Sequence, residues 1–418
     1  MTSADKRLVA RTVALPETPD LFAEAGDTGL LWADERGGLA GIGVAARVDI
    51  PGGLANPESV KRVAEVLQSI EAVDEVGLPG CGPVAIGALP FDPSSSGHLT
   101  IPKRLVGRAG SQGWLTTIEE VGTELVARDA SPSGPASTGV PPDQFNLTSS
   151  MSHRDWKEVV AEAVRALQDG DLVKVVLARR IEITANRAFV VSDVLERLAA
   201  LYPSCMVFSI GGFIGASPEL LMSRIGDRVD SHPLAGTVAR SGDIHGDEAL
   251  VAKLVNSPKA RYEHQVVVDV VRETLSRLCD ELTVPDAPSV VGLRNVSHLG
   301  THITGRLKAA GPERLPTALE LAARVHPTPA VGGTPTEAAI RYLQKVEGFD
   351  RGCYAGPVGW VDSRGDGAWA VGIRCAEVDG STARLYAGNG IVAGSDPAEE
   401  LAETQLKLQA LLAALVRP

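Results

Sequence analysis

The chain has 418 residues, of which 44% are hydrophobic and 22% are charged, and these values exclude global disorder. Acidic residues outnumber basic ones by 52 to 40, which gives a formal net charge of -12. A protein that binds duplex nucleic acid is usually basic, so this charge argues against a nucleic-acid partner.

The first part of the chain, to about residue 145, is rich in glycine and proline. Apolar runs at Leu39–Val48 and Val84–Phe91 predict two strands. The segment Asn56–Ile70 mixes charged and apolar residues at helical spacing, which predicts a helix. We assign residues 1–145 as the N-terminal part of one domain that continues through the rest of the chain.

The periodicity becomes more regular from Ser152. Ser152 and Asp155 have the spacing of a capping box, and Gly170 ends the helix that they begin. The elements predicted after this helix are a strand from Val173, a helix over Ser192–Leu201, and strands over Met206–Ile214 and Leu220–Arg224.

Proline marks the start of later helices. Pro258 follows Ser257 as the first helical residue follows a cap, and predicts a long helix to about Leu282. The other predicted elements are a helix after Thr334, strands over Gly356–Val361, Trp369–Cys375 and Ala383–Ala387, and a last helix from about Asp396. Hairpin-like strands with few βαβ alternations predict an α+β fold of antiparallel sheets covered by helices.

Cysteine usage and the N-terminus predict the compartment. The five cysteines have no CxxC or zinc-site spacing and are typical of reduced thiols. The N-terminus lacks the apolar segment of a signal peptide. No run reaches the roughly 18 apolar residues of a membrane span. We therefore expect a cytoplasmic protein with no membrane partner.

Several common catalytic motifs are absent from the sequence. It has no GxxxxGK[ST] phosphate loop, no HExxH zinc site and no GxSxG nucleophile elbow. Nucleophilic serine hydrolases and zinc hydrolases therefore have no support.

The last predicted helix places Glu400, Glu403 and Lys407 on one face. The ordinary interpretation of such a face is a solvated charged stripe. However, it follows a glycine-rich tract, Ala387–Ile391, which we interpret as a turn whose backbone can approach a ligand closely. The preceding predicted strand also carries Arg374, which is either a salt-bridge partner or a carboxylate clamp.

Other charged residues lie in apolar surroundings. Lys174 belongs to a predicted strand, where a solvated edge lysine is the alternative, and Glu219 ends the tract GASPE, where a turn residue is the alternative. Glu263 lies beside the apolar run QVVVDVV, and a buried acid there needs a partner such as a metal. His298 is by default a hydrogen-bonded core histidine.

Nine tracts in order between about Ser152 and Leu412 carry a resemblance to a known family. They are KVVLARR, GASPELL, HPLAGT, YEH, SHLGT, HPTPAVGGTP, RGCYAGPVGW, AGNGI and EELAETQLK. The chain resembles the chorismate-utilising enzymes, which include isochorismate synthase, salicylate synthase, anthranilate synthase component I and aminodeoxychorismate synthase. The resemblance implies one α+β domain with two large, orthogonally packed antiparallel sheets flanked by helices, and makes residues 150–416 the chorismate-binding catalytic region.

The resemblance also implies residue roles. Lys174 matches the general base that activates water, and Glu219 matches the general acid that protonates the departing hydroxyl. Glu263, Glu400 and Glu403 match the acids of a Mg2+ site. The substrate-binding positions that it implies are Gly236, Thr237, His298, Ala330, Tyr354, Arg374, Gly388, Gly390 and Lys407.

A few positions separate the members of the family. Ala235 stands where aminodeoxychorismate synthases typically carry lysine, and Ala330 stands where anthranilate and salicylate synthases tend to carry threonine. The LLES feedback motif of anthranilate synthases is also absent. The pattern is most similar to isochorismate synthase, with salicylate synthase and then anthranilate synthase component I as alternatives.

A catalytically silent regulatory homologue is a further class, and the presence of both Lys174 and Glu219 argues against it. The expected partner is chorismate as a small-molecule substrate. We expect a monomer that needs no glutaminase subunit.

Overall fold

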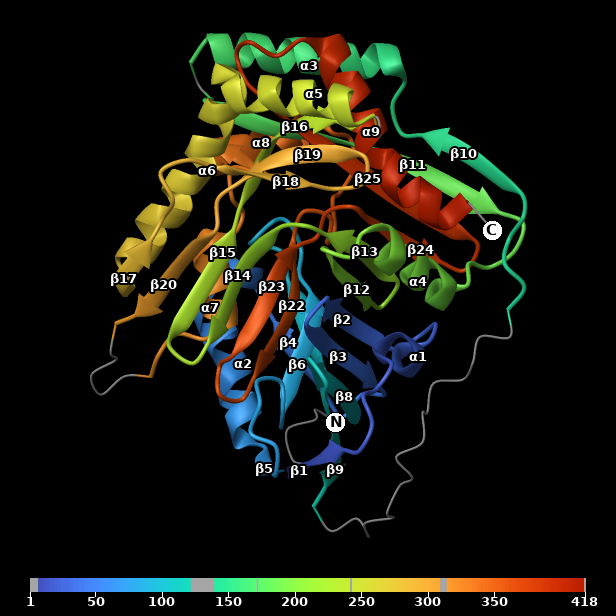
Figure 1. Ribbon diagram of the computed structural model, residues 1–418, viewed down its shortest axis with the longest axis vertical. Helices are drawn as coiled ribbons and strands as arrows, with labels where there is room; N and C mark the ends of the chain where they lie inside the picture. Colours follow the sequence, from blue (N-terminus) through green and yellow to red (C-terminus); the bar gives the residue numbers. More distant parts are fainter. Residues whose placement is uncertain (1–6, 122–138, 171, 241–242, 309–313, 417–418) are drawn as a thin grey trace.

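The computed structural model describes residues 7–121, 139–170, 172–240, 243–308 and 314–416. Within these residues the strands form one 13-stranded sheet, one 9-stranded sheet and one 3-stranded sheet. Figure 1 shows the N-terminal strands at one end of the molecule, and helices α3, α5 and α9 together at the other.

The 13-stranded sheet combines both ends of the chain. All its pairings are antiparallel except the parallel pair β1 and β5. In spatial order its strands are β10 (Phe145–Ser149), β11 (Lys174–Ala185), β25 (Thr382–Ile391), β24 (Cys375–Asp379), β13 (Phe213–Ser217), β12 (Met206–Ile210), β2 (Leu30–Asp34), β3 (Gly37–Ile42), β8 (Arg104–Ala109), β9 (Gln112–Glu120), β1 (Leu8–Leu15) and β5 (Glu71–Asp74), with β21 (Gly333–Thr334) paired to β11.

The other two sheets are antiparallel. The order of the 9-stranded sheet is β17 (Cys279–Thr283), β20 (Ile303–Leu307), β15 (Arg228–His232), β14 (Leu220–Ile225), β23 (Gly367–Val371), β22 (Pro357–Asp362), β6 (Val84–Ala88), β7 (Gly97–Ile101) and β4 (Ala46–Ile50). The small sheet has the order β16 (Leu234–Ala239), β19 (Val296–Gly300) and β18 (Ser289–Gly292). Each large sheet contains strands from before residue 145 and from after it.

Most of the helices begin at a side-chain cap. Asn56, Ser152 and Ser257 accept hydrogen bonds from backbone N–H groups of the first turns of α2, α3 and α6. The helices are α1 (Leu21–Ala25), α2 (Pro57–Ser69), α3 (His153–Gln168), α4 (Val191–Leu201), α5 (Ile244–Asn256), α6 (Pro258–Ser276), α7 (Ala318–Val325), α8 (Thr336–Val346) and α9 (Pro397–Val416), with a short 3-10 helix at Gly53–Ala55. None of the described helices is long and apolar enough to cross a bilayer.

The 13-stranded sheet is buried on both faces. On β2, Trp32 packs into the core that the two large sheets share, whereas Leu31 and Ala33 pack into a second core with residues of α1, α4 and α9. This alternation follows from the two-residue period of a strand. The sheet therefore has a helix-covered face and a face against the other sheet.

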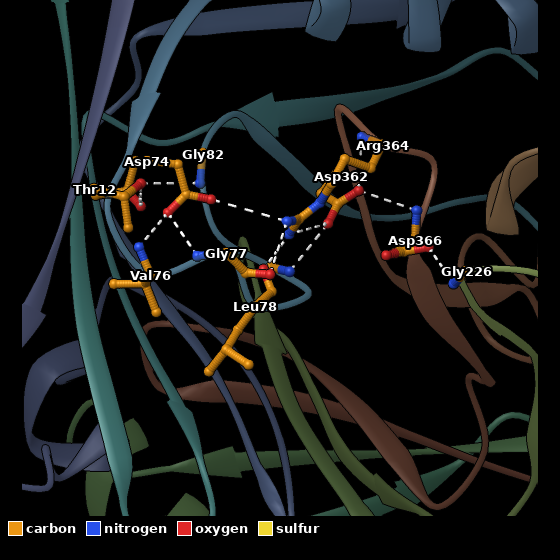
Figure 2. A network of polar contacts seen from close by, with 12 residues as sticks. Thr12, Asp74, Val76, Gly77, Leu78, Gly82, Gly226, Asp362, Arg364 and Asp366 are labelled. Atoms are coloured by element: carbon orange, nitrogen blue, oxygen red, sulfur yellow. Dashed lines mark hydrogen bonds and ion pairs between the residues drawn. The ribbon is translucent and has the colours of Figure 1, made fainter.

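A polar network joins the N-terminal strands to the 9-stranded sheet (Figure 2). Arg364, in the turn between β22 and β23, donates to the carbonyls of Gly77 and Leu78 and lies 3.9 Å from a carboxylate oxygen of Asp74. Asp362 accepts a hydrogen bond of 3.1 Å from the backbone N–H of Gly80. These contacts fix the loop after β5 against the second large sheet.

The predicted α+β class with large antiparallel sheets and flanking helices is confirmed, with a small third sheet and one parallel pair in addition. Several predicted boundaries are wrong. The run Leu39–Val48 is divided between β3 and β4, and Met206–Ile214 turns at Gly211 and Gly212 into the hairpin β12–β13. The long helix α6 ends at Ser276, and Cys279–Thr283 is a strand instead.

Candidate active site

A pocket lies where β11, β25, α6, α9 and the small sheet come together. These elements are in the upper part of Figure 1. Most of the residues that the sequence singled out line the pocket: Glu219, Gly236, Thr237, Glu263, His298, Ala330, Tyr354, Arg374, Gly388, Gly390, Glu403 and Lys407. Lys174 and Glu400 lie directly behind this wall, each in contact with a lining residue or its neighbour.

Lys174 is the first residue of β11 and its side chain is only 1% exposed. Its Nζ lies 3.1 Å from Oε1 of Glu263, which comes from α6. This contact has the distance of an ion pair but not the angles of a hydrogen bond, so the ammonium N–H groups have no hydrogen-bond acceptor among the described residues. Lys174 is thus a buried amine beside an acid of the pocket wall.

Glu219 lies between β13 and β14 and is 3% exposed. Burial raises the pKa of Glu219 to about 7, and this outweighs the lowering by a backbone hydrogen bond from Leu234 and by the cations Lys174, Arg374 and Lys407. The carboxyl group can therefore carry a proton near neutral pH, as a general acid must.

His298 lies on β19 and links the small sheet to Arg374. Its Nδ1 is 3.1 Å from the carbonyl oxygen of Gly236, which can only accept, and its Nε2 is 3.2 Å from Nη2 of Arg374, which can only donate. This pattern requires the neutral tautomer with the proton on Nδ1. Burial, followed by Arg374 and Lys407, lowers the pKa of His298 well below its usual range, which agrees with that tautomer.

Gly236 lies at a bulge of β16, where the register with β19 shifts between Ala235 and Thr237. Its φ of 73° falls in the left-handed region that favours glycine. Thr237, the next residue, has its Oγ1 3.1 Å from Nδ1 of His298. The bulge thus presents a carbonyl and a hydroxyl to the same imidazole.

Arg374 is not in a strand, contrary to the expectation from sequence. The apolar run Trp369–Cys375 is divided between β23 and β24, and Arg374 lies in the connection with a left-handed φ of 51°. Arg374 is half-buried, and its buried Nε has no hydrogen-bond partner among the described residues. Burial lowers the pKa of Arg374, yet an arginine stays charged, so the pocket wall contains a cation suited to an anionic ligand.

The tract Ala387–Ile391 is also not the turn that we expected. It is the end of β25, paired residue by residue with β11, so that Gly388 faces Ala178 and Gly390 faces Val176. The glycines are needed for space rather than for a turn. A Cβ on Gly390 would lie 2.1 Å from Oε1 of Glu263, and one on Gly388 would lie 2.8 Å from the hydroxyl of Tyr354.

Lys407 on α9 is anchored against β25. Its Nζ lies 2.6 Å from Oε1 of Glu403 and donates to the carbonyl of Gly388 at 2.8 Å and to Oδ1 of Asn389 at 3.1 Å. Asn389 in turn donates to the backbone carbonyl and to Oε2 of Glu400. The start of α9 is therefore fixed to the strand that carries the two glycines.

The three glutamates expected to hold a metal come from α6 and α9. Each is paired with a lysine: Glu263 with Lys174, Glu403 with Lys407, and Glu400 with Lys259 at 3.0 Å. Among the described residues, no three acidic, histidine or cysteine side chains are grouped closely enough to hold an ion. The lysines offset part of the negative charge of these acids, although burial and then the charge of Glu403 still raise the pKa of Glu400.

Comparison with known proteins decides the family. The family described as "Chorismate binding enzyme" matches residues 17–416. The chain belongs to the chorismate-binding enzymes. The resemblance read from the nine tracts is thereby confirmed, and the match extends further towards the N-terminus than those tracts do.

Several relatives of this chorismate-binding enzyme are isochorismate synthases by name. DhbC of Bacillus subtilis is 35% identical over 365 residues, 85% of each chain, and EntC of Escherichia coli is 36% identical over 335 residues, 79% of this chain and 80% of that protein. The fold is also that of MenF, the menaquinone-specific isochorismate synthase from Escherichia coli, with a TM-score of 0.80, 24% identity and coverage of 99% and 95%.

In this chorismate-binding enzyme a buried ion pair supports the strand that carries Lys174. Between its pairings with β21 and β10, no strand of the described residues pairs with this edge of β11. There Arg351 donates to the carbonyl of Val176 at 2.5 Å, and Oε1 of Glu347 accepts from the N–H of Ala178 at 2.8 Å. The pair thus provides the hydrogen bonds that a neighbouring strand would otherwise make.

Sequence reasoning missed Tyr386 and Lys259, besides apolar residues of the pocket wall. Tyr386 lines the pocket and stacks on Tyr354 with ring centroids 5.0 Å apart. It could have been found, because Tyr386 lies two residues before Gly388 on the same face of a strand. Lys259 was also missed, although it lies one helical turn before Glu263 on α6.

Proposed function

We propose that this chain is an isochorismate synthase, an isomerase that converts chorismate reversibly to isochorismate by adding water at C2 and losing the C4 hydroxyl. Relatives named as isochorismate synthases at 30–40% identity over most of the chain support this activity. The observation that carries it is that a buried amine, Lys174, and a carboxyl group that can hold a proton near neutral pH, Glu219, lie at the same pocket.

The proposed chemistry is an allylic displacement in which every proton is accounted for. Neutral Lys174 accepts a proton from water as the water oxygen bonds to C2. The ring double bond shifts, the C4–O bond breaks, and Glu219 gives its proton to the departing hydroxyl, which leaves as water. One water enters and one leaves; Lys174 has gained a proton from the entering water, and Glu219 has lost one to the departing water. In the reverse direction the two residues exchange roles.

Substrate binding must overcome an unfavourable overall charge, because chorismate is a dianion and the protein has a net charge of -12. A local concentration of positive charge is therefore required. Arg374 provides it most directly, since it lines the pocket and its buried Nε has no partner in the part of the chain that the structure describes. We assign Arg374 and Tyr354 to one substrate carboxylate, with Thr237 and His298 lining the ring.

We propose that Glu263, Glu400 and Glu403 hold a Mg2+ ion beside the second substrate carboxylate. The donor set fits, because Mg2+ prefers oxygen ligands and is held by a few carboxylates together with substrate and water. The ammonium of Lys259 stands in for a cation there: despite its partial burial, the pKa of Lys259 is raised by Glu400 and also by Glu263 and Glu403. The ion would neutralise the acids and attract the substrate carboxylate.

If the site holds Mg2+, metal and chorismate should bind cooperatively, each tightening the other by the same factor. We expect EDTA to abolish activity, Mg2+ to restore it, and chorismate affinity in titration calorimetry to rise with Mg2+. Glu263→Gln and Glu400→Gln should weaken this coupling without unfolding the protein, whereas Glu399→Gln, on the exposed side of α9, should not. Equal chorismate affinity in EDTA and in Mg2+ would show that these glutamates hold no metal.

Product analysis tests the reaction itself. We expect chromatography of a reaction with chorismate to show isochorismate as the main product and to reach the same mixture from either side. Salicylate with pyruvate would instead support a salicylate synthase, the alternative for which Ala330 in the pocket wall is the discriminating position. An amino product formed from ammonia would support anthranilate synthase component I and would exclude both.

The proposal also covers the domain organisation of the chain and its cellular location. We infer a single domain in which residues 1–145 supply strands to both large sheets and residues 150–416 supply the pocket. We also infer a cytoplasmic monomer without a glutaminase subunit. The five cysteines, all of them unpaired, support a reducing compartment.

A further inference from the structure

Lys259 lies among the acids assigned to the metal. It is in the first turn of α6, and its Nζ donates to Oε1 of Glu400 on α9 at 3.0 Å. Glu263 follows one helical turn later, so both side chains lie on the face of α6 that meets the pocket. A single ammonium group therefore neutralises part of the charge that would otherwise bind the cation.

The three lysines paired with these acids differ in how easily they can move. The side chain of Lys174 is 1% exposed, and that of Lys407 is 11% exposed and bonded to two groups of β25 besides its glutamate. The side chain of Lys259 is 40% exposed, and its hydrogen bond in the described structure is to Glu400. A released lysine side chain regains rotamer freedom in water. Of the three lysines, Lys259 is therefore the one whose displacement from its glutamate costs the least free energy.

Glu400 cannot simply move away from Lys259. Its side chain is 4% exposed, and Asn389 holds both its backbone carbonyl and its second carboxylate oxygen. Lys259 and Asn389 bind different carboxylate oxygens, and Ser395 adds a further hydrogen bond to this carboxylate. A cation that binds Glu400 through Oε1 therefore competes with the ammonium of Lys259.

We propose that Lys259 is a built-in counter-ion of the metal site, which binds Glu400 in the metal-free protein and is displaced when a divalent cation binds. This inference rests on the proposed function, because it assumes the Mg2+ site described above. The affinity for Mg2+ then depends on a competition between the metal ion and the ammonium of Lys259 for the carboxylate of Glu400. This ammonium also supplies a counter-charge for the buried carboxylate of Glu400 when no metal is bound.

Calorimetry of Mg2+ binding to the substrate-free protein tests the competition directly. Removing the competitor with Lys259→Met should tighten Mg2+ binding roughly tenfold, since hydrogen bonds to charged groups are worth roughly 1.5–3 kcal/mol. Lys259→Arg should weaken it, because a guanidinium binds a carboxylate through two hydrogen bonds. Lys253→Met, an exposed site on α5 with the same change in charge, is the matched control and should bind Mg2+ as the wild type does.

A second measurement follows the displacement in the wild-type protein. Acylation by a lysine-selective reagent, followed by peptide mass spectrometry, reports how free each ammonium is. We expect the labelling rate of Lys259 to rise when Mg2+ is added and that of Lys253 to stay constant.

The outcomes separate this inference from the function on which it rests. Unchanged Mg2+ affinity in Lys259→Met, or Mg2+-independent labelling of Lys259, would overturn the displacement while leaving the metal site in place. If Lys259→Arg bound Mg2+ as the wild type does while Lys259→Met bound it more tightly, only long-range charge would be involved and the competition would be refuted. Absence of Mg2+ binding in every variant would refute the metal site and the inference together.

Discussion

Glu219→Gln and Lys174→Ala are each expected to lower kcat by roughly 10²–10⁴-fold, the usual contribution of a general acid or base. Glutamine keeps the shape of the buried Glu219 side chain but cannot give up a proton, and alanine removes the amine of Lys174. Steady-state kinetics on the purified variants, with circular dichroism as the test of folding, measure the effect. Near-normal turnover in either variant would contradict its role.

The pH dependence of the wild-type enzyme should reveal the same pair. The reacting form has Lys174 neutral and Glu219 protonated, so together the two groups hold one proton, whereas the fully protonated pair holds two. Burial raises the pKa of Glu219 to about 7 with the cation of Lys174 nearby, so the first of these two protons leaves near that pH. Activity should therefore rise as the pH increases through about 7, and Glu219→Gln should lose this step.

Measuring stability controls for unfolding in the Glu219→Gln variant. Because the pKa of Glu219 is raised in the folded protein, ionising this carboxyl group destabilises the fold. The pKa of the unfolded carboxyl group is near its ordinary value of 4.5, so between this pH and about 7 the folded protein binds a proton that the unfolded chain has lost. Stability from this group therefore falls as the pH rises through that window. Above it, Glu219→Gln should unfold at a temperature no lower than the wild type, and a loss of activity cannot then be attributed to unfolding.

Local signals in the sequence predicted the helix starts well. Asn56, Ser152 and Ser257 cap helices where expected, because a capping side chain bonds to N–H groups only two or three residues away. Predictions about turns were less accurate. The tract around Gly388 reads as a turn in isolation, yet β11 supplies its hydrogen bonds, and β11 lies about two hundred residues earlier in the chain.

Most residues of the site could be predicted from sequence, because they belong to tracts typical of the family. Which of these residues form ion pairs and hydrogen bonds with one another could not be predicted. Glu400 and Lys259 meet only because α6 and α9 pack beside the same small sheet. Arg374 has the sequence surroundings of a strand residue, and its left-handed backbone depends on the junction between β23 and β24. These features depend on tertiary contacts, which no local spacing encodes.

Gly390→Ala is expected to lower kcat by roughly 10²-fold, the cost of misplacing a reacting group by about 1 Å, although the new methyl group touches no substrate. The backbone of Gly390 is that of an ordinary strand, so alanine fits its conformation. The difficulty is space, because the Cβ would lie 2.1 Å from Oε1 of Glu263 and 2.8 Å from Cε of Lys174. The flexible end of Glu263 must move, and the contact that positions Lys174 is lost.

The control for this variant is Gly394→Ala, in the turn after β25, where a Cβ would meet nothing within 4 Å. It should have wild-type kinetics, and both variants should unfold near the wild-type temperature. Wild-type turnover in Gly390→Ala would show that the close approach of this strand to Glu263 is not required.

A double-mutant cycle identifies which contact the methyl group disturbs. If Gly390→Ala acts by displacing Glu263, then adding it to Glu263→Gln should cost much less than it does alone, because residues that act through one contact are not additive. If the two effects on kcat multiply instead, the methyl group disturbs Lys174 directly through its 2.8 Å approach to Cε. The cycle therefore tests whether the glycine serves the glutamate or the lysine of the pair.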